Sequence, residues 1–221
     1  MFITFEGGEG SGKSSQVALL AGRLRSEGRA VRTTREPGGT PLAGAIRALW
    51  LHPDKSLQAL DKAGLATHDE PTEPMLPVTE ALLLSAARAQ HVARIRDWLA
   101  AGEIVLCDRY ADSTRVYQGA ARGLDVETID ALERMATGGL RPDLTFLLDL
   151  PVAVGLARRR NMTGGDWNWL DAETVAFHER VRAAYLALAA ADPDRWIILD
   201  TTQLPDALAE QIWQAVLARL G

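Results

Sequence analysis

Short apolar runs alternate with helical patterns along the whole chain. The runs at residues 2–5, 30–34, 103–108, 144–150 and 196–200 have the length and composition of buried strands. Between them, hydrophobic residues recur at helical spacing, which predicts helices over 13–27, 41–50, 78–101, 113–122, 126–137, 151–159, 171–191 and 204–220. This alternation predicts an α/β fold, with a five-stranded parallel sheet and helices on both faces.

Two segments interrupt this pattern. Residues 52–76 contain several prolines, mixed charges and no sustained period, so we expect an irregular insertion, with a short helix over about 56–65. A connection of this length often forms a functional flap or loop, and a passive loop is the other reading. Residues 158–172 begin with three arginines and include two adjacent glycines, which is typical of a lid. No linker divides the 221 residues, so we expect a single domain.

Composition and charge exclude several classes of protein. The chain is 47% hydrophobic and 24% charged, which is typical of a globular protein. Its net charge of −5 argues against a nucleic-acid coat or a polybasic membrane-binding protein. The single cysteine, Cys107, excludes an internal disulfide and a cysteine zinc site, and the four histidines lack metal-ligand spacing and are expected at the surface or on helix faces. We expect a cytoplasmic protein with no nucleic-acid or membrane partner.

The first turn of the chain matches the phosphate-binding pattern G-x-x-x-x-G-K-[ST] at every fixed position. Its residues are Gly7, Gly8, Glu9, Gly10, Ser11, Gly12, Lys13 and Ser14, followed by Ser15. The glycines allow backbone N–H groups to surround phosphate oxygens at the start of a helix. Lys13 is expected to contact the β- and γ-phosphates of ATP, and the Ser14 hydroxyl is expected to bind Mg²⁺.

The third predicted strand ends in Asp108, Arg109 and Tyr110. The carboxyl ends of parallel strands form the ligand-binding edge of such a sheet. Asp108 can hold Mg²⁺ through water and Arg109 can grip a phosphate with two hydrogen bonds, whereas a surface ion pair is the plain alternative.

Three consecutive arginines, Arg158, Arg159 and Arg160, precede the glycines of the expected lid. A lid can bring positive charge to a phosphoryl group in transfer while it excludes water. A solvated basic end of a helix remains the alternative. The chain has neither the N-K-x-D sequence of GTPases nor the Asp-Glu pair of motor ATPases, so a small-molecule kinase remains.

The sequence resembles the bacterial thymidylate kinases over nearly its whole length. The matching segments are residues 5–14, 35–40, 108–110, 113–114, 117–119 and 138–145. The resemblance implies a three-layer P-loop NTPase fold of the adenylate-kinase-like kind with a short lid. It also implies a homodimer that transfers a phosphoryl group from ATP, with Mg²⁺, to dTMP and so serves dTTP biosynthesis.

The resemblance assigns roles to individual residues. Those expected at dTMP are Glu9, Glu36, Pro37, Arg47, Leu84, Arg88, Arg109, Thr114, Tyr117 and Gln118. Glu9 is expected near the sugar, and Arg47 and Arg109 at the acceptor phosphate. Arg88, Thr114 and Gln118 are expected to read the base. Gly10 stands where the eukaryotic-like branch has an arginine, so the lid arginines are expected to supply the catalytic cation, together with Lys13 and Arg109.

The chain departs from the family pattern at the base and in the lid. Leu84 stands where a phenylalanine usually stacks on thymine, and Val116 stands where alanine is usual. Residues 168–171, Asn-Trp-Leu-Asp, replace the usual Asp-Arg-x-Glu, and Trp167 and Trp169 could anchor the lid. Two alternatives therefore stay open, namely a kinase for another pyrimidine nucleotide such as dUMP, and a nucleotide-binding regulator with little turnover.

Overall fold

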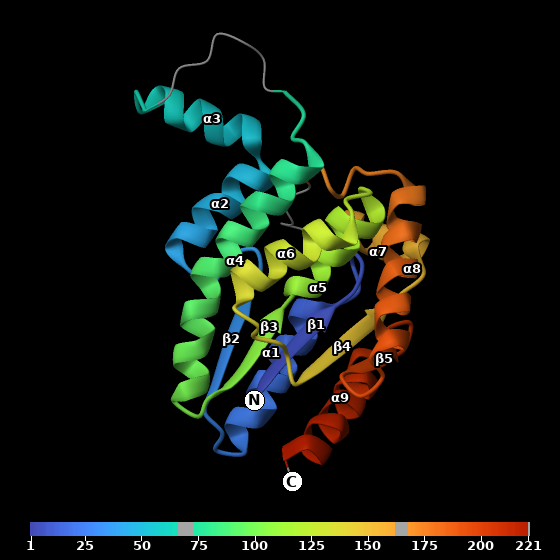
Figure 1. The fold of residues 1–221 in the computed structure, drawn as a ribbon. Helices are drawn as coiled ribbons and strands as arrows, with labels where there is room; N and C mark the ends of the chain where they lie inside the picture. Colours follow the sequence, from blue (N-terminus) through green and yellow to red (C-terminus); the bar gives the residue numbers. More distant parts are fainter. Residues whose placement is uncertain (66–72, 162–167, 221) are drawn as a thin grey trace.

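A five-stranded parallel sheet forms the centre of the protein (Figure 1). The computed structural model describes residues 1–65, 73–161 and 168–220. The strands are β1 (Phe2–Glu6), β2 (Val31–Arg35), β3 (Ile104–Asp108), β4 (Leu144–Asp149) and β5 (Trp196–Asp200), in the order β2-β3-β1-β4-β5. Every neighbouring pair is parallel, so the carboxyl ends of all five strands face one end of the molecule.

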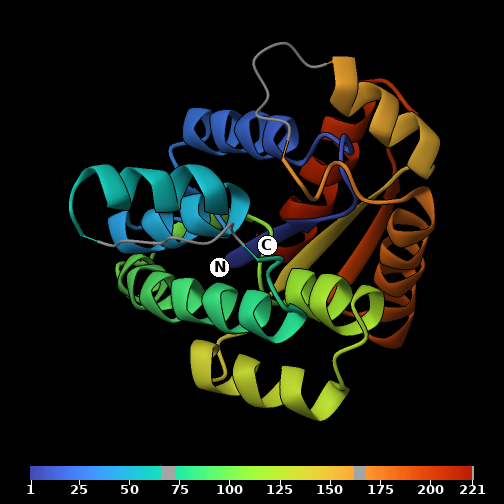
Figure 2. The same ribbon diagram turned by 90° about the horizontal axis from the view of Figure 1, so that it is seen from above.

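Helices cover both faces of the sheet, as the view from above shows (Figure 2). They are α1 (Lys13–Ser26), α2 (Pro41–Leu51), α3 (Pro53–Lys62), α4 (Pro77–Ala100), α5 (Ala111–Thr114), the π-helix η1 (Arg115–Ala121), α6 (Val126–Thr137), α7 (Val152–Asn161), α8 (Val175–Ala191) and α9 (Pro205–Leu220). Within the described ranges, no helix combines the length and apolar character needed to cross a bilayer.

The core explains why the strands are almost continuously apolar. Ile3 and Phe5 of β1 pack with α1 and α9 on one face of the sheet. Phe2 points to the other face, where it packs with Val92 and Ile95 of α4. Because both faces are covered, β1 is buried along its whole length, and β3 and β4 are buried up to their last residues, Asp108 and Asp149. The expected three-layer arrangement is confirmed.

Three boundaries differ from the sequence-based expectation. The segment 52–76 is not irregular throughout, because Pro53 at the first turn starts α3. The expected helix 113–122 is split into the short α5 and the π-helix η1, and the backbone N–H of Arg122 bonds to Tyr117 O, five residues back. The helix expected from 171 begins at Val175, because the Thr174 side chain caps it by accepting from the Phe177 N–H.

Candidate active site

The phosphate-binding loop joins the central strand β1 to α1. Gly7, Gly10 and Gly12 have positive φ, and Gly12 starts the helix in the left-handed conformation. A Cβ at Gly10 would lie 2.1 Å from the backbone oxygen of Gly155 in α7, so only glycine fits there. The loop therefore rests directly on the helix that leads into the lid.

Lys13 folds back over this loop. Its Nζ donates to Gly8 O at 2.8 Å, Gly7 O at 3.2 Å and Ser11 Oγ at 3.2 Å. Burial, and then the nearby guanidinium of Arg109, lower the pKa of Lys13 to about 8. The ammonium is thus held where the loop's N–H groups can receive an anion.

Ser14 and Asp108 meet at the carboxyl edge of the sheet. The Ser14 hydroxyl donates to Asp108 Oδ2 at 2.5 Å. A hydroxyl and a carboxylate are oxygen ligands of the kind Mg²⁺ prefers, so the pair fits the expected metal. Among the residues that the structure describes, no group of three or more His, Cys, Asp or Glu side chains could hold a metal. The pair would therefore share the ion with substrate phosphates and water.

Arg109 connects the phosphate-binding loop to the neighbouring pocket. Its backbone has a φ of 69°, which is uncommon for a residue with a side chain and recurs at functional sites. Its Nη2 donates to Glu9 Oε1 at 2.6 Å, and its guanidinium lies 5.1 Å from the centre of the Tyr117 ring. Burial would raise the pKa of Glu9, but Arg109 and then Lys13 lower it to about 2. The carboxylate is therefore ionised and fixed.

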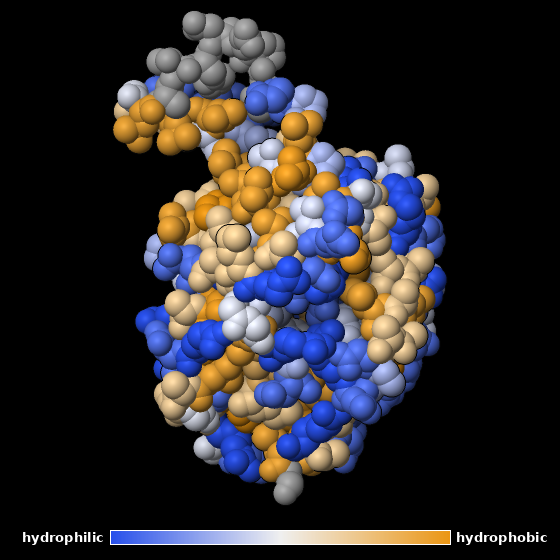
Figure 3. Space-filling view, viewed as in Figure 1, coloured by the Kyte–Doolittle hydropathy of each residue, from blue (hydrophilic) through white to orange (hydrophobic). Residues whose placement is uncertain are grey.

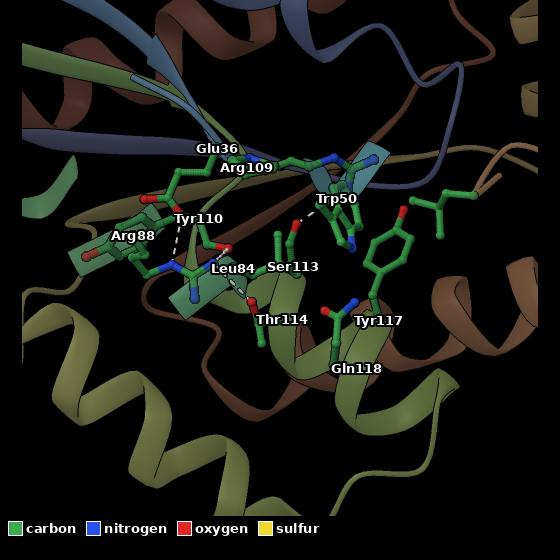
Figure 4. Close-up of a pocket in the computed structure, with 12 residues that line it drawn as sticks. Glu36, Trp50, Leu84, Arg88, Arg109, Tyr110, Ser113, Thr114, Tyr117 and Gln118 are labelled. Carbon is green, nitrogen blue, oxygen red and sulfur yellow. Dashed lines mark hydrogen bonds and ion pairs between the residues drawn. The ribbon is translucent and has the colours of Figure 1, made fainter. Parts of the chain in front are cut away.

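A pocket opens beside Arg109, between α2, α4 and η1 (Figure 4). It has an empty volume of about 400 Å³, counting its open mouth. Its walls are Glu36, Pro37, Trp50, Leu84, Arg88, Arg109, Tyr110, Ser113, Thr114, Tyr117, Gln118 and Leu170. The walls combine apolar rings with a few buried polar groups, which is typical of a small-molecule site.

Arg88 is a buried polar group of this pocket with several hydrogen bonds. It is 4% exposed, and its Nε donates to Glu36 Oε2 at 2.7 Å, while Nη2 bonds to Thr114 Oγ1 at 3.0 Å. Glu36 also contacts His91 Nδ1 at 3.0 Å. The histidines were expected at the surface or on helix faces, and His91 and His178 do lie on helices α4 and α8, but both are buried. His91 instead supports the carboxylate that holds Arg88.

Most of the residues expected at dTMP come together here. Eight of the ten line this one pocket, and Glu9 contacts it through Arg109 and Tyr117. Arg47 is outside the pocket wall, where its Nη1 donates to Pro37 O at 3.1 Å. Burial, then Arg35 and Arg109, lower the pKa of Arg47 to about 10.

Sequence reasoning missed Trp50 in the pocket wall. Trp50 is 6% exposed and packs edge to face on Trp169, with 5.5 Å between the ring centroids. The Trp169 indole N–H donates to Trp50 O at 2.8 Å. Leu84, which stands where the family has an aromatic residue, could have indicated that another residue supplies an aromatic ring near the base.

The lid arginines are outside the pocket wall. The Nη1 of Arg158 donates to Thr201 O at 3.0 Å, and Arg159 pairs with both oxygens of Asp171 at 2.8 and 2.9 Å. Arg160 is exposed at the end of α7. Residues 162–167 of the expected lid, with Trp167, are outside the described residues. The catalytic role of these arginines stays a prediction.

Comparisons with known proteins show the family to which the chain belongs. A sequence model of the family described as Thymidylate kinase matches residues 5–212. A thymidylate kinase of Thermomicrobium roseum is 52% identical over 97% of this chain and 93% of its own length, and one of Trichlorobacter lovleyi is 46% identical over 100% and 99%. The crystal structure of thymidylate kinase from Ehrlichia chaffeensis is similar with a TM-score of 0.70 and 30% identity, covering 98% of each chain. These matches confirm the expected P-loop phosphotransferase fold, and the chain belongs to the thymidylate kinase family.

Proposed function

We propose that this protein transfers the γ-phosphoryl group of ATP to the 5′-phosphate of dTMP, giving dTDP and ADP. The observation that carries the proposal is the link between the two sites. Arg109 contacts Glu9 of the phosphate-binding loop and also lines the pocket that contains Arg88, Thr114 and Gln118. A phosphate held at Arg109 would therefore lie between the donor loop and the base pocket.

The donor side acts by positioning and by charge stabilisation. The glycine loop and Lys13 hold the β- and γ-phosphates. An oxygen of the acceptor phosphate forms a bond to the γ-phosphorus while the bond to the β-phosphate oxygen breaks. The acceptor is already an anion, so no general base is required, and Lys13, Arg109 and the lid arginines stabilise the charge.

The acceptor side reads a nucleotide from phosphate to base. Arg47 and Arg109 hold the phosphate, and Glu9 and Tyr117 lie near the sugar. The base enters beside Leu84 and Trp50, where its polar edge meets Arg88, Thr114 and Gln118. Trp50 offers the aromatic surface that Leu84 lacks, and this supports a planar base as the ligand.

Mg²⁺ is part of the proposal. When bound, it neutralises charge on the β- and γ-phosphates of the nucleotide. Ser14 and Asp108 would hold it at the carboxyl end of β3, where their side chains meet.

We also infer that the protein acts as a cytoplasmic homodimer. Large apolar side chains are exposed on the adjacent helices α2 and α4, with Leu42 57% exposed, Val78 42% and Leu82 53%. Figure 3 shows apolar surface where α2, α3 and α4 meet. A face of this kind is typical of an interface between subunits. With a net charge of −5, nucleic acid and membranes are not expected as partners.

A coupled assay of ADP release over a panel of nucleoside monophosphates tests the proposal. We expect dTMP to give the largest kcat/KM. Lys13→Ala should lower kcat by about 10²-fold or more, because one donor at the transition state is lost, while dTMP still binds. A higher kcat/KM for dUMP would favour the alternative acceptor. Absence of dTMP-dependent turnover in the unmodified protein would favour a regulator.

A further inference from the structure

The side-chain amide of Gln118 is held in one orientation. Gln118 is 1% exposed on η1, and its amide points into the space surrounded by Trp50, Ser113, Thr114 and Tyr117 (Figure 4). Its Nε2 donates to Glu80 Oε2 at 2.8 Å. Its Oε1 is buried and has no hydrogen-bond partner among the described residues. A buried carbonyl oxygen without a partner is costly, so this oxygen is left for a ligand.

Glu80 of α4 fixes this orientation. A carboxylate only accepts hydrogen bonds, so the amide must turn its NH₂ group toward Glu80 and its oxygen away. Glu80 is 2% exposed, and its Oε1 lies 3.4 Å from Arg122 Nε. Arg122 is held in turn by Glu173 at 2.6 Å. Burial raises the pKa of Glu80, while the hydrogen bond from Gln118 and the charge of Arg122 oppose this shift.

The facing polar group of the pocket has the opposite hydrogen-bonding character. Arg88 uses Nε for Glu36 and Nη2 for Tyr110 O and Thr114 Oγ1, at 3.2 and 3.0 Å. Its Nη1 has no hydrogen bond to the described part of the chain. Arg88 therefore offers a donor to the pocket and Gln118 offers an acceptor. The indole N–H of Trp50, in the same wall, is a further buried donor without a partner among the described residues.

We propose that Glu80 is a positioning residue that sets base selectivity, by holding the Gln118 carbonyl toward ring atom N3 of the acceptor base. Thymine and uracil carry a hydrogen on N3 and an oxygen at C4, which match the acceptor of Gln118 and the donor of Arg88. Cytosine carries a lone pair on N3 and an amino group at C4. With cytosine, the Gln118 oxygen would face the N3 lone pair, so two acceptors would meet. The Arg88 N–H would face the amino group, so two donors would meet. A site built for the pattern of thymine therefore rejects cytosine strongly.

The substitution Glu80→Gln tests this role. In the variant, the new amide at position 80 keeps its oxygen toward Arg122, so its NH₂ group faces Gln118. The Gln118 amide then turns its oxygen to that group and presents Nε2 to the base. We expect kcat/KM to fall for dTMP and to rise for dCMP, so that their ratio drops at least tenfold, mainly through KM. An unchanged ratio in the folded variant would overturn the proposal.

Glu173→Gln is the matched control. Like Glu80→Gln, it removes one negative charge next to Arg122, but residue 173 does not contact Gln118. The ratio of kcat/KM for dTMP to that for dCMP should therefore stay within about twofold of the wild-type value. A second test places Glu80→Gln in a Gln118→Leu background, where it should change the ratio no further. A purely structural effect of Glu80 would lower the ratio in both backgrounds, and this would contradict the proposal.

A crystal structure of the wild-type protein with dTMP gives a test that does not depend on the folding of a variant. We expect the Gln118 amide between Glu80 and N3 of the base, within hydrogen-bond distance of both. A base whose N3 contacts another group would overturn the inference. The inference rests on the proposed function, but the two fail differently. If wild-type protein does not phosphorylate dTMP, the function is wrong, whereas dTMP turnover with unchanged selectivity in Glu80→Gln contradicts only the role of Glu80.

Discussion

At the scale of single residues, Glu6 and Glu9 have opposite pKa shifts although they are three residues apart. Glu6 lies at the end of β1 and accepts from Tyr110 N, Ser113 Oγ and Tyr185 Oη. Burial, and then the charge of Asp112, raise its pKa to about 7. The charge on Glu9 is instead stabilised by Arg109. Glu6 is thus a buried carboxyl that keeps its proton up to about pH 7.

Glu6→Gln should change how stability depends on pH. Folded Glu6 keeps its proton up to about pH 7, but the unfolded chain releases it near 4.5. The free energy of unfolding therefore falls as pH rises from about 4.5 to 7, by about 3 kcal/mol at most from this group. Thermal unfolding measured from pH 4.5 to 8 should show that the wild type loses stability with rising pH and that Glu6→Gln lacks this part of the loss. The exposed Glu27→Gln is the control, and a constant difference between wild type and Glu6→Gln would contradict the assignment.

Asp108→Asn should raise the Mg²⁺ requirement. Loss of one carboxylate charge weakens the oxygen site shared with Ser14, so the Mg²⁺ concentration for half-maximal rate should rise by about fivefold or more. Titration of the rate with Mg²⁺ at fixed ATP checks this. An unchanged midpoint together with a lower plateau would place Asp108 outside the metal site.

At the scale of elements, residues 168–171 pack against the wall of the proposed acceptor pocket. Trp169 packs on Trp50 of α2, Leu170 lines the pocket, and Asp171 pairs with Arg159 of α7. The Trp50–Trp169 pair thus joins residues 168–171, part of the segment expected to form the lid, to the wall of this pocket. The tryptophan at 169, which departs from the family pattern, has this packing role.

Trp169→Ala should weaken dTMP binding more than ATP binding. An edge-to-face pair contributes about 1 kcal/mol beyond area burial and a hydrogen bond about another 1 kcal/mol, so the KM for dTMP should rise by about tenfold or more. Trp169→Phe keeps an aromatic ring but loses the N–H donor, so its KM for dTMP should lie between those of the wild type and Trp169→Ala. Steady-state kinetics with each substrate varied in turn give both KM values. Equal increases for ATP and dTMP would mean that the contact supports the whole fold.

At the scale of the whole molecule, the alternation of apolar runs and helical periods was sufficient to predict the layered parallel sheet. The motifs also predicted most of the pocket wall, because Arg88, Thr114 and Gln118 stand at family positions. The sequence could not predict Trp50 in that wall or the orientation of the Gln118 amide. Both depend on tertiary contacts, and Glu80 is 38 positions from Gln118. The π-helix was missed because its spacing differs from the helical period that the pattern tests.

Leu82→Glu should weaken the proposed dimer. Leu82 is 53% exposed on α4, and two negative charges brought together at a two-fold interface repel each other. Light scattering after size exclusion should show a dimer for the wild type and a shift to monomer for Leu82→Glu. Leu204→Glu is the control, because Leu204 is exposed and lies just before α9. A wild-type protein that is monomeric at high concentration would contradict the dimer.

The contact between Gly10 and Gly155 limits how this enzyme can change in evolution. Gly10 has no room for a side chain, because the backbone of α7 occupies that space, and a Cβ at Gly155 would lie 2.4 Å from Glu9 O. A loop arginine at position 10 and an α7 seated on the loop exclude each other sterically. An arginine could therefore enter the loop at position 10 only after α7 had been displaced. Selection is therefore expected to remove single substitutions at either glycine. A change to a loop with an arginine at position 10 would need a substitution in the loop and a shift of α7 at the same time.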